Sequence, residues 1–399
     1  MDGLTLETAI ETLLSNTQQI KDVETVSILD SVGRFTSKDY FAKFDNPPFN
    51  RSPLDGYALN SAETAGATAE NPKEFKIVAE ECAGDFFDGE IKKFECLRIM
   101  TGAAIPSSCD CVIRQEDIQT DGKKILVPYE LKHHENFCFA GEDVKSGTIL
   151  IEKNTQLNSK HIAILASQGF GSVDVFRVPR IAVASTGDEL LDPNVKLSNG
   201  KIYNSNLFFM ASRLKELGFE PLILGNLRDD IKSACQKIRS VANEIDMLIT
   251  TGGVSVGKKD IMHGVISEIG EKIFWRVLMK PGAPVIGWKT DKFLGLALSG
   301  NPFAAFATFE LLARPIIAKL SGNKNILYNQ INAELADEFN KKSPARRFIR
   351  ARYLNERVYL QNQHTSGTFY SMADCNCLVD IPAGTDKLSI GDRVKIILL

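Results

Sequence analysis

The chain has 399 residues, of which 44% are hydrophobic and 24% are charged, and its formal net charge is −3 at pH 7. This length predicts about two to four globular domains, and the acidic balance argues against nucleic acid as the main partner, because phosphate neutralisation needs a basic face. No apolar run approaches the roughly 18 residues of a membrane-spanning helix, and the N-terminus lacks the basic start of a secretory signal, so we expect a cytoplasmic protein without membrane association.

The first part of the chain mixes helical and extended patterns. A helix-like apolar stripe over residues 5–20 opens on Thr5, a typical N-cap residue. The proline-rich segment that follows residue 43 cannot be helical, and short β-like runs alternate with glycine turns up to about residue 141. Residues 141–170 return to strand, turn and helix, and we expect this segment to pack on the N-terminal helix.

The pattern changes at residue 180, where buried strands begin to alternate with amphipathic helices. We predict strands at 180–185, 220–226 and 246–251, with helices at 205–217 and 229–243 between them. The third strand is continuously apolar, as a strand buried on both faces should be. Further strands follow between residues 274 and 298, and a long apolar helix begins at Pro302. This alternation predicts a doubly wound α/β domain.

After residue 326 the pattern is again entirely β-like. The predicted fold class is therefore α/β combined with β-rich domains. We divide the chain into an N-terminal mixed α/β domain (1–43 together with 141–177), a β-rich insertion domain (44–140), a central doubly wound α/β domain (178–321) and a small C-terminal β-barrel (327–399).

Unusual polar and glycine-rich sequences follow several strands of the central domain. In a doubly wound sheet, ligands bind at the carboxyl ends of the strands. The sequences at those ends are STGDEL, NLRDD, TTGGVSVGKKD, KPGAP and SGNP. Their convergence on one edge of the sheet predicts a binding site there.

The glycine turns are typical of an anion site. Glycines at 252, 253 and 257 permit positive φ and let backbone N–H groups face an anion without an intervening Cβ. Pro302 at the first turn of a helix directs the positive helix end to the same place, and Lys280 adds a full positive charge. These residues predict a cradle for an oxyanion.

Acidic residues occur on the same turns: Asp188, Glu189, Asp229, Asp230 and Asp260. Carboxylates and phosphate tolerate one another only with a cation between them, and Mg²⁺ prefers oxygen ligands together with several waters. The sequence therefore predicts a phosphorylated ligand bridged by a hard divalent metal. Helix capping is the alternative explanation for the pairs at 188–189 and 229–230.

Eight motifs in this order resemble those of the molybdopterin molybdenumtransferases of the MoeA family, which include the E domain of gephyrin. The motifs are SPLDGYA, RIMTGAAIP, GEDVKSG, STGDEL, TTGGVSVGKKD, KPGAP, SGNP and SMADCN. They extend over essentially the whole chain, and DGYA, MTGA and TTGGVSVGKKD are the most specific.

The resemblance implies a homodimer with a central domain of the MogA/MoaB type. The active cleft would lie between this domain of one subunit and the DGYA/MTGA domain of the other. The implied reaction inserts molybdate into the dithiolene of adenylylated molybdopterin in the presence of Mg²⁺ and releases AMP. The implied protein partners are a MogA-like adenylyltransferase and molybdoenzymes that accept the cofactor.

The residues carried over by the resemblance fall into three groups. The predicted catalytic residues are Asp55, Thr101, Glu189, Asp229, Asp260 and Lys280. The predicted substrate-binding residues are Asp188, Gly252, Gly253, Ser255, Gly257, Arg276, Pro281, Gly282, Ser299, Gly300, Asn301, Pro302 and Ser371. The predicted metal ligands are Glu189, Asp229 and Asp260. Asp55 and Thr101 would reach the cleft from the partner subunit.

The chain departs from the family pattern at several positions that usually carry positive charge. Ala283 replaces the second lysine of KPGKP, and CFAGED lacks the basic residues that commonly precede GED. Leu54 replaces the methionine before DGYA, and Ser299 replaces the proline before GNP. The departures motivate an alternative, a MoeA-like pterin-binding or scaffold protein with weak or no catalysis. A different phosphoanhydride or amide hydrolase is the third interpretation.

Overall fold

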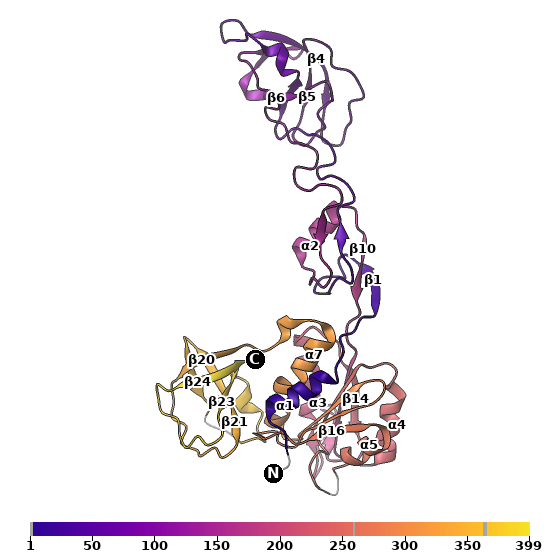
Figure 1. The fold of residues 1–399 in the computed structure, drawn as a ribbon, viewed down its shortest axis with the longest axis vertical. Coiled ribbons are helices and arrows are strands. Elements are labelled where there is room, and N and C mark those ends of the chain that lie inside the picture. Colours follow the sequence, from indigo (N-terminus) through magenta and orange to yellow (C-terminus); the bar gives the residue numbers. More distant parts are fainter. Residues whose placement is uncertain (1–2, 258–259, 362–364) are drawn as a thin grey trace. The chain divides into compact units, whose positions relative to one another are not determined.

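The computed structural model describes residues 3–257, 260–361 and 365–399 (Figure 1). The chain forms two compact units, the first made of Met1–Val23 and Phe176–Leu399 and the second of Glu24–Val175. Within the described ranges, no helix is long and apolar enough to cross a lipid bilayer.

A six-stranded sheet forms the centre of the first unit, with strand order β14-β11-β15-β19-β18-β16. The strands β14, β11, β15 and β19 run parallel, and β18 and β16 are antiparallel to their neighbours. In chain order they are β11 (Ile181–Thr186), β14 (Leu222–Leu227), β15 (Met247–Thr251), β16 (Glu271–Trp275), β18 (Ile286–Lys289) and β19 (Leu294–Leu298). The predicted doubly wound domain is confirmed.

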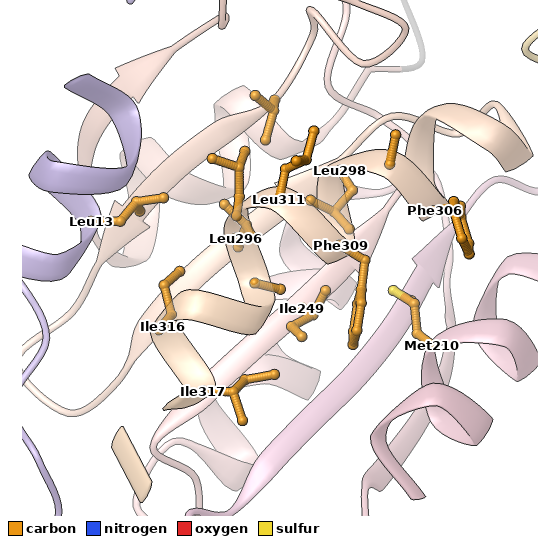
Figure 2. Packing of buried hydrophobic residues seen from close by; sticks show 14 of the residues in the cluster. Leu13, Met210, Ile249, Leu296, Leu298, Phe306, Phe309, Leu311, Ile316 and Ile317 are labelled. Carbon is orange, nitrogen blue, oxygen red and sulfur yellow. The ribbon is translucent and has the colours of Figure 1, made fainter. Parts of the chain in front are cut away.

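Helices cover both faces of this sheet. On one face, Ile181 and Val183 pack with residues of α1 (Leu6–Ser15), α3 (Ser205–Glu216), α6 (Pro302–Thr308) and α7 (Arg314–Ser321), as Figure 2 shows for part of this core. On the other, Ala182 and Ala184 pack with residues of α4 (Ile231–Val241) and α5 (Met262–Ile269). Successive residues of one strand therefore enter two separate cores, which explains the continuous apolar sequence of these strands.

The N-terminal helix α1 begins where the sequence predicts but packs elsewhere. Its N-cap Thr5 accepts a hydrogen bond from the Thr8 amide, and the helix ends at Ser15 rather than near residue 20. Leu13 is buried in the α/β core and the helix contacts α7. The expected packing of residues 141–170 on this helix was wrong, because the apolar stripe of a helix does not specify which distant surface covers it.

Helices α3 and α4 of the central domain lie close to the predicted residues, but the structure differs from the prediction in three places. The segment from Pro302 is interrupted by a π-helical turn, η3 (Phe309–Ala313), before α7 continues. Helix α5 and the short parallel pair of strands β12 (Leu190–Leu191) and β13 (Ile202–Tyr203) were not predicted.

The C-terminal part is a small barrel, as predicted. Five strands in the order β21-β22-β20-β24-β23 close through pairing of β21 with β23. Their bounds are β20 (Gln330–Leu335), β21 (Arg346–Leu354), β22 (Arg357–Leu360), β23 (Cys377–Ile381) and β24 (Arg393–Leu398), with the 3-10 turns η4 (Lys324–Ile326) and η5 (Tyr370–Met372). A two-residue strand, β17 (Met279–Lys280), joins the open edge of β21.

The second unit contains mainly β-structure. Its six-stranded sheet has the order β6-β3-β5-β4-β8-β7. The strands are β3 (Gly56–Leu59), β4 (Lys73–Glu81), β5 (Glu95–Ile99), β6 (Cys111–Arg114), β7 (Gln119–Thr120) and β8 (Lys124–Val127), with the turns η1 (Ser61–Thr64) and η2 (Gln115–Asp117). The remaining elements are β1 (Val23–Ser27), β2 (Tyr40–Phe41), β9 (Ile149–Ile151), α2 (Ser159–Ser167) and β10 (Ser172–Phe176). The β-rich character of this region is confirmed, and the boundaries of the four domains stay a prediction.

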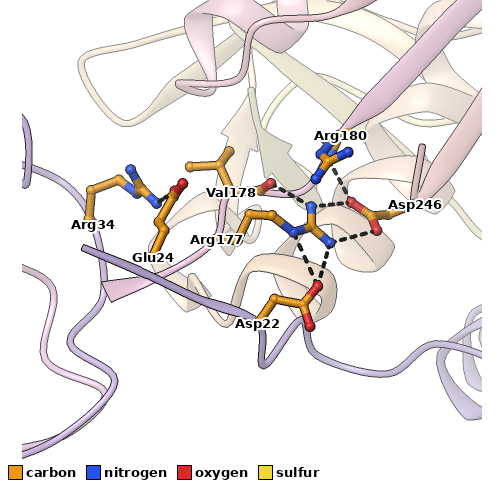
Figure 3. A network of polar contacts seen from close by, with 7 residues as sticks. All are labelled: Asp22, Glu24, Arg34, Arg177, Val178, Arg180 and Asp246. Carbon is orange, nitrogen blue, oxygen red and sulfur yellow. Dashed lines mark hydrogen bonds and ion pairs between the residues drawn. The ribbon is translucent and has the colours of Figure 1, made fainter. Parts of the chain in front are cut away.

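An ion-pair cluster fixes the entry into the central sheet (Figure 3). The Arg177 guanidinium donates to both carboxylate oxygens of Asp246, at 2.8 and 3.0 Å, and to Asp22 at 3.0 and 3.2 Å. Asp246 also accepts from the Arg180 amide at 2.7 Å. These partners raise the pKa of Arg177. The cluster therefore joins the segments that precede β11 and β15 and holds the two strands in register.

Replacing Asp246 by alanine should lower the free energy of unfolding by about 2–3 kcal/mol, because it leaves a largely buried guanidinium without its main partner. The side chains of Arg177 and Asp246 are each 17% exposed, so solvent screens the pair only partly. Urea denaturation followed by circular dichroism measures the change. Asp291→Ala, at an exposed turn residue, is the control and should have almost no effect. Equal midpoints for the two variants would contradict this role of the cluster.

Candidate functional site

A pocket of about 820 Å³ lies at the carboxyl ends of the parallel strands of the first unit. All of the turns singled out from the sequence contribute to its wall. The lining residues are Thr186, Gly187, Glu189, Leu190, Ile202, Tyr203, Asn204, Ser205, Asn206, Asp229, Thr251, Gly252, Gly253, Val254, Ser255, Gly257, Asp260, Pro284, Ser299, Gly300, Asn301, Pro302 and Gly367. The strand-end interpretation therefore gives the correct position for this pocket.

The turn after β15 passes too close to the end of β11 for a side chain at its first glycine. Gly252 has φ +90°, and a Cβ at this residue would lie 2.6 Å from the Thr186 hydroxyl oxygen. A Cβ on Gly300 would lie 3.4 Å from the Cα of Gly252. The Gly252 amide donates to the Leu298 carbonyl at 3.0 Å. Glycine at 252 is thus required by both its backbone conformation and its neighbours.

The acids predicted as metal ligands, Glu189, Asp229 and Asp260, all line this pocket. The Asp260 carboxylate accepts a hydrogen bond from the Gly257 amide of its own turn. In the described part of the chain, no three acidic, histidine or cysteine side chains are gathered closely enough to hold a metal ion by themselves. Mg²⁺ usually takes one or two carboxylates together with waters and substrate phosphates, so this set fits a magnesium–phosphate complex better than a closed metal cage.

The other two acids have structural contacts. The Asp188 amide donates to the Asp229 carboxylate and the Asp229 amide donates to the Asp188 carboxylate, both at 3.3 Å. Asp230 is the N-cap of α4 and accepts from the Ser233 amide at 2.8 Å. Asp188 and Asp230 are absent from the residues that line the pocket. Asp188 therefore supports the position of Asp229, and Asp230 caps a helix.

The KPGAP segment lies largely outside the pocket. Lys280 belongs to β17 and pairs with Arg347 of the barrel strand β21. Lys280, Pro281 and Gly282 do not line the pocket, whereas Pro284 does. Gly282 has φ +91°, and a Cβ there would lie 2.4 Å from the Thr308 methyl group, so its conformation serves packing. The sequence predicted KPGAP at the carboxyl end of a strand of the α/β sheet, but the strand that runs into it, β17, pairs with the barrel strand β21.

Arg276 also lies outside the lining. Its guanidinium carbon is 4.3 Å from the centre of the Trp275 ring, and Trp275 donates to the Val254 carbonyl at 3.1 Å. Val254 is part of the pocket wall. Arg276 therefore reaches the site only through Trp275. None of the described lining residues is Lys or Arg, and Lys258 and Lys259 of the TTGGVSVGKKD turn lie outside the described residues.

The barrel supplies one wall residue, Gly367, through the turn that precedes Ser371. Arg350 is fully buried and donates to the Thr365 and Thr368 carbonyls, at 2.6 and 3.1 Å. Its guanidinium also lies 4.2 Å from the Phe303 ring centre. Ser371 itself bonds Thr368 at 3.2 Å and does not line the pocket. The turn is therefore held by Arg350, a residue that the sequence interpretation missed.

A second missed residue, Asn206, links the two glycine turns. Its side-chain amide donates to the Gly300 carbonyl at 2.8 Å and to the Thr251 hydroxyl at 3.2 Å. Because a carbonyl can only accept, the Gly300 contact fixes which end of the amide is nitrogen. The neighbouring Asn204 caps α3 and donates to Ser185 at 2.6 Å. The NSN sequence at a helix start was the only available signal for either residue.

The DGYA and MTGA motifs meet within the second unit. Asp55 precedes β3 and Thr101 follows the adjacent strand β5, and Gly56 pairs with Ile99. The Thr101 hydroxyl and amide both donate to the same Asp55 carboxylate oxygen, at 2.7 and 2.8 Å. Both bonds lower the pKa of Asp55, and the bond from the Thr101 hydroxyl contributes more than the bond from the Thr101 amide. The predicted pair is therefore brought together by the strand register.

Comparison with known proteins agrees with this architecture. Residues 4–169 match the family of the MoeA N-terminal region (domain I and II), residues 182–319 match a probable molybdopterin binding domain, and residues 332–399 match the MoeA C-terminal region (domain IV). The fold and the strand-end pocket thus define a multidomain protein built around a domain of the molybdopterin-binding type.

Relatives of known name share this arrangement over almost their whole length. The molybdopterin molybdenumtransferase of a Staphylococcus epidermidis strain is 33% identical over 401 residues, which is 99% of this chain and 95% of that protein. A Staphylococcus aureus relative of the same name is 34% identical over 96% of this chain and 93% of that protein. The crystal structure of the molybdopterin biosynthesis MoeA protein from Pyrococcus horikosii matches with a TM-score of 0.87 and 29% identity, covering 100% of this chain and 99% of that one. The chain belongs to the MoeA family.

Alanine at Gly252 should weaken the binding of pyrophosphate with Mg²⁺ by about ten-fold or more, because the new Cβ displaces the turn from Thr186. Gly391→Ala is the matched control, since Gly391 has a similar φ of +89° but nothing within 4 Å of the added Cβ. The control should lose only about 1 kcal/mol of stability and keep binding unchanged. Titration calorimetry measures the affinity. Equal affinities for Gly252→Ala and Gly391→Ala would contradict the prediction that the turn at Gly252 contacts the phosphate.

Replacing Thr101 by valine should raise the pKa of Asp55 toward its ordinary value of about 3.9, because the hydroxyl donor is lost. A lowered carboxyl pKa stabilises the folded state above the unfolded pKa, and this contribution is lost as the pH falls through the folded pKa. Carboxyl ¹³C titration by NMR measures the shift. Asp121, whose pKa is lowered by the amides of Lys123 and Lys124, is the internal control and should not move.

Proposed function

We propose that this chain acts in molybdenum cofactor biosynthesis as a molybdopterin molybdenumtransferase. The observation that carries the proposal is the single pocket that receives all five strand-end turns of a MoeA-family chain, with three carboxylates and paired glycine turns in its wall. The proposed reaction inserts molybdate into the dithiolene of adenylylated molybdopterin and cleaves the phosphoanhydride, releasing AMP.

The protein's own residues would bind and orient the substrate. The glycines of the turns after β15 and β19 would let backbone N–H groups approach the phosphoanhydride oxygens without an intervening Cβ, apart from the amides of Gly252 and Gly257, which donate to Leu298 and Asp260. Asn206 would keep the two turns at a fixed separation, and Arg350 would hold the barrel turn that reaches the pocket through Gly367. Cleavage of a phosphoanhydride depends largely on positioning and charge neutralisation, and this arrangement can supply positioning.

Charge neutralisation would come from Mg²⁺, with Glu189, Asp229 and Asp260 as the residues that hold it. The absence of Lys and Arg from the described lining supports this assignment, because three carboxylates alone would repel a phosphorylated ligand. When bound, Mg²⁺ would neutralise phosphate charge. Because Lys280 and Arg276 do not line the pocket, they would fulfil their proposed roles only from outside its immediate wall.

We also propose a cytoplasmic homodimer in which Asp55 and Thr101 of one subunit complete the site of the other. The Asp55–Thr101 pair supports this, because both of its hydrogen bonds go to one carboxylate oxygen of a half-buried acid and leave the other oxygen available. A MogA-like adenylyltransferase would supply the substrate, and molybdoenzymes would receive the product.

The purified protein should release AMP from adenylylated molybdopterin only when both Mg²⁺ and molybdate are added. Asp260→Ala should nearly abolish release, by about 100-fold or more, because it removes a metal ligand. Asp291→Ala is the charge-matched control and should retain full activity. Chromatographic quantification of AMP gives the rate.

The same assay separates the alternatives. Tight pterin binding without AMP release would favour the scaffold protein, an alternative motivated by Ala283 and the CFAGED sequence. Mixing inactive Asp55→Asn protein with inactive Asp260→Ala protein should restore part of the activity if the site is shared between subunits, because one of the two clefts in a mixed dimer is then intact. No recovery after proven subunit exchange would contradict the shared site.

A further inference from the structure

The pocket has one apolar side, formed by Leu190, Ile202 and Tyr203. The opposite turns contribute mainly glycines, hydroxyls and carboxylates. Ile202 is 57% exposed and Tyr203 is 42% exposed, although both belong to a strand that lines a pocket. Tyr203 is the only aromatic residue in the described lining. Exposed tyrosines are common on protein surfaces, but an exposed ring in the wall of a pocket that also holds carboxylates is a specific feature.

Tyr203 is held in a rigid setting. Strands β12 and β13 pair in parallel, with Leu191 opposite Tyr203. The Ile202 amide donates to the Glu189 carbonyl at 3.0 Å, and the Asn204 amide donates to the Leu191 carbonyl at 2.9 Å. The backbone on both sides of Tyr203 is therefore bonded to the turn that carries Glu189. The backbone that carries the ring is therefore held beside one of the proposed metal ligands, so little backbone entropy is left to lose on binding.

Within the described residues the Tyr203 side chain forms no hydrogen bond, aromatic-ring contact or ion pair, and 42% of it is exposed. An aromatic face stacks on planar nitrogen heterocycles with little dependence on their identity, and each such contact contributes substantially to affinity. The glycine turns and acids suit phosphate and metal but offer no comparable surface for a ring.

We propose that Tyr203, flanked by Leu190 and Ile202, is the ring-stacking residue of this pocket and determines which end of the ligand faces β13. The inference rests on the proposed function, since it requires a ligand that carries both a phosphate and a planar heterocycle. The phosphoanhydride lies at the glycine turns and the ring lies against Tyr203. The heterocycle is the adenine or the pterin of the substrate, which share this chemistry.

Three small probes separate ring binding from phosphate binding: AMP, ribose 5-phosphate, which lacks the ring, and 6-hydroxymethylpterin, which lacks the phosphate. Each is titrated with Mg²⁺ into wild-type protein, Tyr203→Ala, Tyr203→Phe and the control Tyr359→Ala. Tyr359 is 41% exposed, lies on the barrel strand β22 and does not line the pocket.

We expect Tyr203→Ala to weaken at least one of the ring-bearing probes by about ten-fold, as loss of a base-stacking aromatic side chain does. Tyr203→Phe should stay within about two-fold of wild type, because it keeps the π-face. Ribose 5-phosphate should bind all four proteins alike, which also shows that Tyr203→Ala is folded. Weakened AMP assigns the ring to adenine, and weakened hydroxymethylpterin assigns it to pterin.

Two outcomes would overturn the inference. If ribose 5-phosphate binds wild type and both ring-bearing probes bind Tyr203→Ala as tightly as wild type, Tyr203 does not stack the ring, and the proposed function is unaffected. If ribose 5-phosphate fails to bind wild type at all, the pocket does not hold a phosphorylated ligand. In that case the proposed function fails first and the inference fails with it.

Discussion

The structure depends on three parallel strands, β11, β15 and β19, that end at the same level. Ser185 pairs with Thr251, and Thr251 pairs with Leu298, so the turns that follow these strands must occupy the same small volume. Only glycine at 252 fits there, because the Thr186 hydroxyl takes the place of a side chain. The turns that line the pocket are consequently rich in glycine, at Gly252, Gly253, Gly257 and Gly300. Strand register thus determines the chemistry of the site.

Features with a local signal could be predicted from the sequence. The continuous apolar runs gave the buried strands, and the 3.6-residue spacing gave α3 and α4 within a few residues of their observed ends. A general rule, that ligands bind at the carboxyl ends of parallel strands, then placed Glu189, Asp229 and Asp260 around one pocket without any knowledge of the helices between them. The roles of these acids remain predictions, because position alone does not test chemistry.

Features that depend on contacts between distant segments could not be predicted. Helix α5 contains Gly264, which reads as a helix breaker, but a Cβ there would lie 2.4 Å from Ile231 of α4, so the glycine allows two helices to pack closely. The partner of β17 is the barrel strand β21, nearly seventy residues away in sequence. Asn206 acts through Gly300, a residue that no local pattern connects with it. Each of these contacts becomes evident only when the tertiary structure is known.

The charge balance of the pocket indicates how affinity is distributed in this member of the family. Three carboxylates and no basic side chain among the described lining residues give a site whose side chains repel an anion. Backbone N–H groups carry only partial charges, so they orient a phosphate better than they neutralise it. In the proposed complex, a chain with Ala283 in place of a lysine would therefore obtain more of its binding free energy from the proposed cation and from uncharged surfaces. Tyr203 carries the only aromatic ring among the described lining residues, and stacking on it would depend little on the negative charge of the acids. An apolar contact at one end of the ligand would thus complement a wall whose described residues carry no fixed positive charge at the other.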